Sequence, residues 1–129
     1  MILDTSFLVD VLRGKDAVKP IETEIDEGQN AAVTSVTVME LWQGIREADD
    51  HAAERDAVEI LLSQFPTQSF SSAAARVAGE IQADLKEAGV RIDAEDVMIG
   101  AIARHRAEPV VTADPDHFEQ IPGLTVRSY

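Results

Sequence analysis

The sequence predicts an α/β fold, a single domain over residues 1–129 in which helices cover both faces of a parallel sheet. Short apolar runs alternate with longer segments in which apolar residues recur every three or four positions. A chain of 129 residues suits one domain. Its 45% apolar content and seven glycines indicate a compact fold rather than a disordered one.

The first strand and the first helix meet at Asp4. Residues 1–3 are apolar and predict a short buried strand, and Thr5 or Ser6 is expected to cap the helix that follows. A carboxylate at the end of a buried strand, beside a helix N-terminus, lies where open α/β sheets bind ligands. Asp4 is therefore either such a binding group or only a turn residue.

The rest of the chain continues the alternation of helices and strands. The expected elements are a helix ending near Gly28, a strand over 31–34, a helix capped by Ser35, a helix over 57–65, a strand over 67–70, a helix capped by Ser71 or Ser72 and ended by Gly89, a helix capped by Asp93 and reaching about residue 107, a strand over 109–112, a short helix opened by Pro115, and a strand over 124–127. The core face of the helix after Ser35 is expected to hold Val38, Leu41, Trp42 and Ile45.

The bulk composition narrows the class of protein. Twenty-four acids against eleven bases give a net charge of −13, which at first sight argues against a nucleic-acid binder. The acids are scattered, so a general surface adaptation to a salt-rich cytoplasm is an alternative, and charge does not decide the function. The absence of cysteine excludes thiolate metal sites and suits a reducing cytoplasm. Neither a membrane span nor a signal peptide is expected.

Two acids lie on helices beside small residues. Glu40 has Gly44 four positions later, and Asp96 has Gly100 four positions later, so each acid faces a small residue on its own helix face. A glycine inside a helix costs about 0.8–1 kcal/mol relative to alanine, so each glycine needs a reason. Either a ligand or another backbone approaches there, or the helix simply packs tightly.

The acids near the other helix starts have a structural alternative. Asp114 follows a predicted strand, as Asp4 does, but an Asp before Pro115 also makes a good helix cap. Asp116 lies in the first helical turn, where an acid complements the helix dipole. Asp93 is interpreted as a helix cap for the same reason.

Four segments together resemble the PIN-domain family. They are Ile-Leu-Asp-Thr-Ser-Phe-Leu-Val at 2–9, Glu-Leu-Trp-Gln-Gly at 40–44, the helix Asp-Val-Met-Ile-Gly-Ala-Ile-Ala at 96–103, and the C-terminal signature at 110–118 with Ile-Pro-Gly-Leu at 121–124. The segments span the chain in the order found in that family. The resemblance is closest to the VapC-type toxin ribonucleases.

The resemblance implies a five-stranded parallel sheet of order 3-2-1-4-5, with an acidic cluster at the carboxyl ends of its strands. Carried over by position, the acids are Asp4, Glu40, Asp96 and Asp114. It also implies Mg²⁺ or Mn²⁺ as cofactor, cleavage of a structured RNA, an antitoxin protein that occupies the site, and a homodimer. Ser6 stands where many relatives have Asn, and Gly100 where the family more often has Ala.

Elementary electrostatics agrees with a metal at such a cluster. Two carboxylates ~4 Å apart repel by about 4 kcal/mol at an effective dielectric near 20, so they need a cation to hold them together. Oxygen ligands without thiols favour Mg²⁺ or Mn²⁺. We expect Asp4 and Asp96 to bind the ion directly, and Glu40 and Asp114 to contact it through water or to act as the base. The hydroxyls expected to orient these carboxylates belong to Thr5, Ser6 and Thr112.

The basic residues are weaker predictors, because each is either a phosphate contact or a solvated surface charge. The candidates for RNA contact are Arg13, Lys15, Arg46, Arg91, Arg104 and Arg106. The three histidines, His51, His105 and His117, are interpreted as surface or packing residues, and His117-Phe118 as an anchor for the last short helix.

Two other functions compete with a nuclease. A receiver-type signalling domain would need a phospho-accepting Asp at the end of a middle strand and a late lysine, but Asp49-Asp50 lies between predicted helices and no lysine follows Lys86. A catalytically silent binding module of the same fold is the second alternative. Measured RNA cleavage would separate it from the enzyme.

Overall fold

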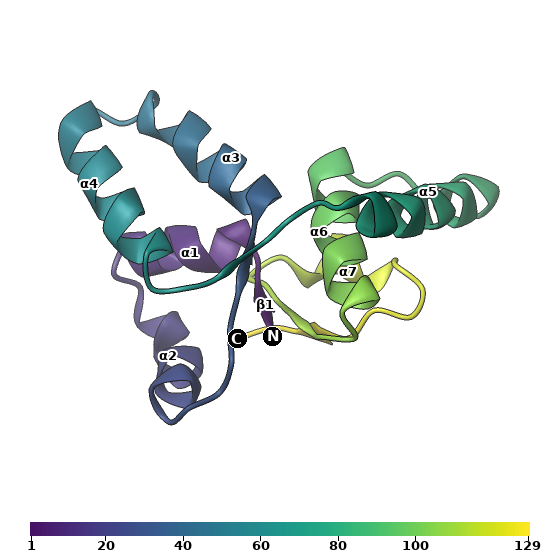
Figure 1. The fold of residues 1–129 in the computed structure, drawn as a ribbon, viewed down its shortest axis with the longest axis horizontal. Coiled ribbons are helices and arrows are strands. Elements are labelled where there is room, and N and C mark those ends of the chain that lie inside the picture. Colours follow the sequence, from purple (N-terminus) through teal and green to yellow (C-terminus); the bar gives the residue numbers. More distant parts are fainter.

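Short strands alternate with helices throughout the computed structural model, which describes residues 1–129 (Figure 1). The elements are β1 (Ile2–Leu3), α1 (Thr5–Leu12), the 3₁₀ helix η1 (Asp16–Val18), α2 (Lys19–Asp26), β2 (Val33–Thr34), α3 (Ser35–Ile45), α4 (His51–Leu62), β3 (Thr67–Gln68), α5 (Ser72–Glu87), α6 (Ala94–His105), β4 (Val110–Val111), α7 (Pro115–Glu119) and β5 (Val126–Arg127). The predicted alternation is confirmed, although every strand is only two residues long.

The strands are parallel but fall into two hydrogen-bonded sheets, of order β1-β4-β5 and β2-β3. A single parallel bridge between Ile2 and Ala32 links β1 to the segment before β2. The expected single five-stranded sheet of order 3-2-1-4-5 is therefore wrong as a continuous ladder. Between β1 and β2 the ladder is reduced to this bridge, with hydrogen bonds from the Leu3 N–H to the Ala32 carbonyl and from the Ala32 N–H to the Met1 carbonyl.

Helices cover both faces of these strands, as Figure 1 shows, with α5, α6 and α7 on one side and α1, α3 and α4 on the other. Successive strand residues alternate between the two sides. Ile2 and Val110 belong to a cluster of 15 buried apolar residues with α5 and α6. Leu3 and Val111 belong to a second cluster, of 12 residues, with α1, α3 and α4. All four side chains are fully buried, as expected for a parallel sheet covered on both faces.

The predicted helix caps are confirmed in part. The cap expected at Ser35 is wrong, because Thr34 is the N-cap residue of α3 and its hydroxyl accepts a hydrogen bond from the backbone N–H of Thr37 at 3.1 Å. Ser71 caps α5, because its hydroxyl accepts a hydrogen bond from the backbone N–H of Ala74 at 3.1 Å. Gly89 follows α5 with φ of 70°, the left-handed conformation that ends a helix at glycine. The prediction that Thr5 or Ser6 caps α1 is wrong. Asp4 occupies the N-cap position, so both hydroxyl residues fall inside the first turn and their side chains turn toward neighbouring groups.

The predicted core face of α3 is also partly wrong. Leu41 and Ile45 are buried, but Trp42 is 45% exposed, and the other buried positions are Val36 and Thr37. The packed face is thus rotated around the helix toward Val36 and Thr37. The rotation turns Glu40 toward α1 rather than toward solvent.

The helices are too short to cross a membrane. The longest, α5, has 16 residues, whereas a bilayer span needs about 20 predominantly apolar ones.

Candidate active site

An acid-lined cavity of about 640 Å³ opens beyond the carboxyl ends of β1 and β4. These strands are neighbours in the sheet, and the helices that follow them, α1 and α7, pack on opposite faces. Such a reversal of chain direction leaves a crevice in open α/β sheets, and ligands bind there. The acids lining the cavity are Asp4, Asp10, Glu40, Asp93, Asp96, Asp114 and Asp116.

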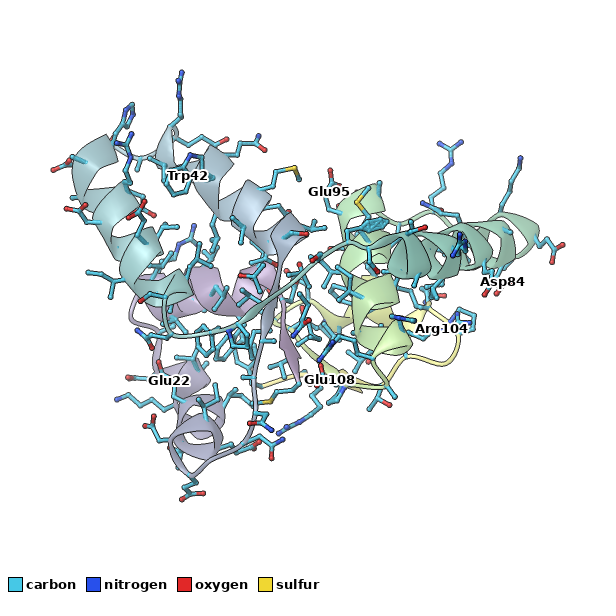
Figure 2. All side chains as sticks on the ribbon, in the orientation of Figure 1. Glu22, Trp42, Asp84, Glu95, Arg104 and Glu108 are labelled. Atoms are coloured by element: carbon cyan, nitrogen blue, oxygen red, sulfur yellow. The ribbon has the colours of Figure 1, made fainter.

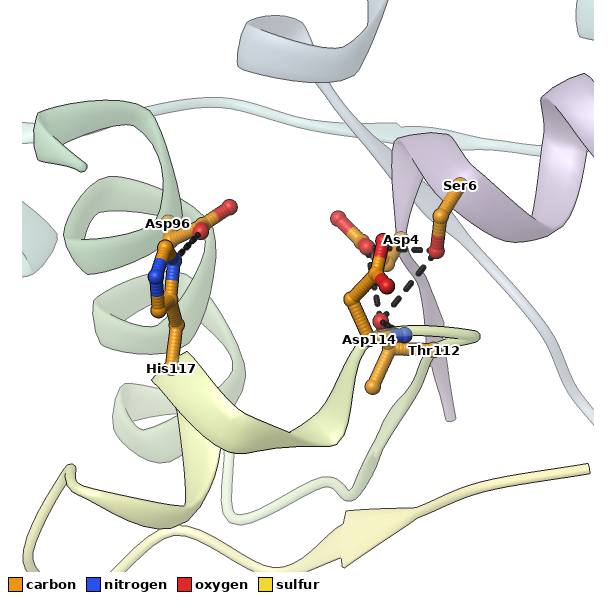
Figure 3. Close-up of polar contacts among 6 residues, drawn as sticks. All are labelled: Asp4, Ser6, Asp96, Thr112, Asp114 and His117. Carbon is orange, nitrogen blue, oxygen red and sulfur yellow. Dashed lines mark hydrogen bonds and ion pairs between the residues drawn. The ribbon is translucent and has the colours of Figure 1, made fainter. Parts of the chain in front are cut away.

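Asp4 lies at the centre of this cavity and is only 5% exposed. Its Oδ2 accepts a hydrogen bond from the Ser6 hydroxyl at 2.8 Å and another from the Thr112 hydroxyl at 2.9 Å. Ser6 and Thr112 lie 3.2 Å apart, but each hydroxyl has one proton and both protons point to Asp4 (Figure 3). The carboxylate is therefore fixed through one oxygen, which leaves Oδ1 for a ligand.

The same hydroxyls hold the loop after β4 against α1. Ser6 Oγ accepts a hydrogen bond from the backbone N–H of Ala113 at 3.0 Å, and Thr112 Oγ1 accepts one from the backbone N–H of Asp114 at 3.0 Å. Ser6 thus fulfils the donor role toward Asp4 that an Asn amide would fulfil at this position. These hydrogen bonds join the loop that bears Asp114 to the first turn of α1.

Glu40 approaches the cavity from α3. The Thr5 hydroxyl donates a hydrogen bond to Glu40 Oε1 at 2.7 Å, which is possible because Thr5 lies inside the first turn of α1. Burial raises the pKa of the Glu40 carboxyl, and the nearby charges of Asp4 and Asp96 raise it further. Glu40 therefore combines a fixed position with reduced acidity.

Asp96 and His117 face Asp4 from the other side of the cavity (Figure 3). His117 Nδ1 lies 2.6 Å from Asp96 Oδ2, and the two side chains are 45% and 23% exposed. Burial raises the pKa of Asp96, while the hydrogen bond to Asp96 raises the pKa of His117. The other oxygen of Asp96 points across the cavity toward Asp4.

Asp93 completes this side of the cavity. It occupies the N-cap position of α6, but its side chain makes no capping hydrogen bond. Ligand atoms of Asp93, Asp96 and His117 all lie within 4.8 Å of one another. Asp93 therefore occupies the predicted N-cap position of α6, but its carboxylate makes no capping hydrogen bond and belongs to the cluster.

These groups fit a hard divalent cation. The donors are carboxylate oxygens from both sides of the cavity, the kind of ligand that Mg²⁺ and Mn²⁺ accept. Crowded acids whose pKa values rise on burial are also groups that a bound cation would stabilise as carboxylates.

The acids after β4 lie on the rim of the cavity. Asp114 and Asp116 both line it and both are exposed. Asp114 is the N-cap residue of α7, yet its side chain makes no capping hydrogen bond. Its backbone N–H donates to Thr112 Oγ1, so Asp114 lies on the Asp4 side of the cavity, opposite Asp96 and His117 (Figure 3).

The structure brings two of the six candidate basic residues to the cavity, Arg13 and Lys15. The other four lie elsewhere. Arg46 lines a separate groove between α3 and α4, Arg91 borders a third hollow, Arg104 donates a hydrogen bond to the Pro122 carbonyl, and Arg106 pairs with Glu108 at 3.3 Å.

The two glycines beside the acids have different surroundings. A Cβ at Gly100 would lie 2.6 Å from Ile121 Cδ1 and 3.3 Å from a methyl of Leu124, so tight packing against the C-terminal segment explains this glycine. A Cβ at Gly44 would meet nothing within 4 Å, and the structure gives no reason for glycine there.

Two members of the cluster, Asp93 and His117, were not predicted as site residues from the sequence. A signal for Asp93 was present, because residues three apart share a helix face and Asp93 precedes Asp96 by three. His117 follows Asp114 by three residues, but its meeting with α6 depends on how α7 packs, and Phe118, buried in the α5–α6 cluster, provides that packing.

Comparisons with known proteins agree with this geometry. The model of the PIN-domain family matches residues 1–124. The chain belongs to the PIN-domain family. The resemblance inferred from the motifs is thereby confirmed, and the receiver-type alternative is excluded.

Within the PIN-domain family, the relatives are VapC ribonucleases. The chain is 27% identical over 128 residues to the tRNA(fMet)-specific endonuclease VapC of Shigella flexneri, covering 99% of this chain and 96% of that protein. It is 32% identical over 120 residues to ribonuclease VapC5 of Mycobacterium tuberculosis, covering 89% and 83%. This PIN-domain protein is therefore grouped with the VapC-type proteins.

Solved structures show the same fold. The VapBC2 complex of Rickettsia felis, bound to a DNA fragment from its promoter, has a chain that superposes with a TM-score of 0.92 at 22% identity, covering 99% of this chain and 97% of that one. DNA-bound VapBC of Salmonella typhimurium gives a TM-score of 0.90 at 26% identity, covering 98% and 96%.

Proposed function

We propose that this PIN-domain protein hydrolyses phosphodiester bonds in structured RNA with the help of Mg²⁺ or Mn²⁺. The observation that carries the proposal is the pair of carboxylates facing each other across the cavity, Asp4 and Asp96, each held through one oxygen. Each carboxylate keeps its second oxygen for an ion between them. The position at a switch point of the sheet supports the same conclusion.

Asp4 and Asp96 would hold the ion, with the Asp93 carboxylate close enough to Asp96 to join them. When bound, the ion would supply positive charge for the scissile phosphate and lower the pKa of an attacking water. Ser6 and Thr112 keep Asp4 in one orientation, and His117 keeps Asp96 in one orientation.

Glu40 is the base in this proposal. A general base works best when its pKa lies near the working pH, and burial moves the pKa of Glu40 upward in that direction. The Thr5 hydroxyl keeps one oxygen of Glu40 in place and leaves Oε2 to take a proton. Asp114, on the rim, is placed to contact the ion through water, whereas Asp116 supports the N-terminus of α7.

Structured RNA is the proposed substrate, because the Shigella relative is named as an endonuclease specific for tRNA(fMet). The test is incubation of the purified protein with total RNA, with Mg²⁺, with Mn²⁺ and with excess EDTA, followed by mapping of the cut ends. Discrete cuts that need the metal are expected. Full cleavage in EDTA would contradict the metal-dependent mechanism, and no cleavage under any condition would favour the silent binding module.

A cognate antitoxin is the proposed protein partner, since the solved neighbours are VapBC complexes. An unpartnered groove of about 770 Å³ between α3 and α4 exposes Met39 and Trp42, at 51% and 45%, and shares no lining residue with the acid-lined cavity. Figure 2 shows Trp42 on α3. Trp42 is the single tryptophan, so a shift of its emission to shorter wavelength on adding a candidate antitoxin reports burial of this groove. An unchanged spectrum in a complex that forms would place the contact elsewhere.

A homodimer remains a prediction from the resemblance, and a cytoplasmic location remains a prediction from the absence of cysteine. Light scattering of the purified protein tests the first, with a mass near twice 14.0 kDa expected.

A further inference from the structure

One face of α1 lines the cavity along the whole length of the helix. The lining residues are spaced by four, as Thr5, Val9 and Arg13 and as Ser6 and Asp10. Eight residues of helix separate Thr5 from Arg13, a rise of about 12 Å at ~1.5 Å per residue. The face therefore leads from the acids at the centre of the site to a basic end at Arg13 and Lys15.

Arg13 is free to bind an anion. It ends α1, is exposed, and forms no ion pair or side-chain hydrogen bond within the protein. By contrast, Arg104, Arg106 and Arg127 are engaged by protein groups. The net charge of the protein is −13, but charges more than ~8 Å apart are largely screened from one another at physiological salt. An exposed arginine can therefore attract an RNA phosphate locally.

Lys15 is held beside Arg13 by a buried acid. Asp10 is 8% exposed, and its Oδ1 lies 2.9 Å from Lys15 Nζ. Gly14, with φ of 67°, lets the chain turn back, so that the backbone N–H of Lys15 also donates to the Asp10 carbonyl at 3.0 Å. Asp10 thus fixes the backbone of this basic turn through its main-chain carbonyl and the Lys15 side chain through its carboxylate.

Tyr129 holds Asp10 from the far end of the sequence. Its hydroxyl donates to Asp10 Oδ2 at 2.8 Å, and its ring packs edge-on against Phe7 with centroids 5.2 Å apart. Both oxygens of Asp10 are therefore occupied, one by Lys15 and one by Tyr129. Asp10 lines the cavity but is committed to positioning its basic end rather than to binding an ion at the centre.

Resting on the proposed ribonuclease function, we propose that the RNA strand runs along this face of α1, with the scissile phosphate at the acids and a phosphate a few nucleotides away at Arg13 and Lys15. Asp10 and Tyr129 are positioning residues for this second phosphate contact. A rise of about 3.4 Å per nucleotide makes ~12 Å a separation of a few nucleotides.

The test measures binding of fluorescently labelled, unfractionated tRNA in Mg²⁺, in an Asp96→Asn background that does not cleave. Arg13→Ala should weaken binding about tenfold and reduce the salt dependence by about one phosphate contact, while Arg13→Lys retains most of the affinity. Arg76→Ala on α5, which removes an exposed arginine outside the cavity, is the matched control and should change the Kd less than twofold. Equal effects of Arg13→Ala and Arg76→Ala would overturn the proposal.

Tyr129→Phe tests the positioning role, because it keeps the ring on Phe7 and removes only the hydroxyl. We expect about threefold weaker tRNA binding with unchanged Mn²⁺ affinity, and tRNA binding equal to that of the parent protein would remove Tyr129 from the proposal. In the cleaving protein, Arg13→Ala should raise KM more than it lowers kcat. Failure of the wild-type protein to cleave RNA would count against the proposed function, whereas cleavage without an Arg13 effect would count against the α1 path alone.

Discussion

His117 Nδ1 lies 2.6 Å from Asp96 Oδ2, and this contact joins α7 to α6 at the edge of the acidic cavity. The imidazole fixes one oxygen of the carboxylate and leaves the other directed toward Asp4 (Figure 3). A group that orients a metal ligand in this way commonly contributes 10–100-fold to metal affinity.

His117→Ala should accordingly weaken Mn²⁺ binding by about 10–100-fold, measured by titration calorimetry or by the EPR signal of free Mn²⁺. His51→Ala, at an exposed histidine on α4, is the control and should bind Mn²⁺ normally. If His117→Ala folds and binds Mn²⁺ as the wild-type protein does, the histidine has no role at the metal.

Asp4→Asn and Asp96→Asn should each abolish cleavage and leave the melting temperature unchanged or raised in the absence of metal, because one charge leaves a repelling cluster. Unfolding of either variant would show that the residue is structural. Asp84→Asn, on the exposed side of α5, controls for the loss of one negative charge.

The pH dependence of the Asp96→Asn effect has a definite sign. Burial raises the pKa of Asp96 in the folded protein above its usual 3.8. Asp96 therefore contributes stability that is fully present below about pH 3.8 and is lost as the pH rises through the raised folded pKa. Any stability gain of the Asn variant should appear at neutral pH and disappear near pH 4 in melting scans with EDTA. A gain that grows at low pH would contradict this origin.

Asp114→Asn should slow metal-dependent cleavage at least tenfold, or about 1.4 kcal/mol in transition-state free energy. Asn is also a good N-cap, so this change tests charge rather than capping. Asp116 lies two residues later, in the first turn of α7, and Asp116→Asn should have a much smaller effect. A larger loss from Asp116→Asn in the same single-turnover assay would make Asp116 the fourth acid.

Asp10→Asn should destabilise the protein by about 1–2 kcal/mol at pH 7, since its carboxylate accepts two hydrogen bonds, one from a half-exposed lysine. The Lys15 ammonium and the Tyr129 hydroxyl lower the pKa of Asp10. This contribution is therefore present above the unfolded pKa near 3.8 and is lost as the pH falls through the lower folded pKa. Urea unfolding at pH 7 and pH 3 measures it, and an equal loss at both values would refute the linkage.

Several features that depend on neighbouring residues could be predicted from the sequence. The run Ile2–Leu3 before Asp4, the cap at Ser71 and the stop at Gly89 are each set by neighbouring residues, and each was predicted. The family resemblance also followed from motifs within single elements.

The sequence was a poor guide where the outcome depends on packing between elements. The exposure of Trp42 follows from the rotation of α3 against α4, and the contact of His117 with Asp96 follows from the burial of Phe118. The strands form two sheets because a single bridge at Ile2 is all that pairs β1 with the segment before β2. None of these is recorded in the local pattern of apolar residues.

The most direct test of the account is the chemistry of the RNA ends that the protein produces. If the carboxylate cluster around Asp4 and Asp96 activates water through a divalent ion, the ribose 2′-hydroxyl is not the nucleophile. Ligation-based end mapping of RNA cut in Mg²⁺ or Mn²⁺ should then find 5′-phosphates on the downstream fragments. Fragments with 5′-hydroxyls and 2′,3′-cyclic phosphates would contradict the account.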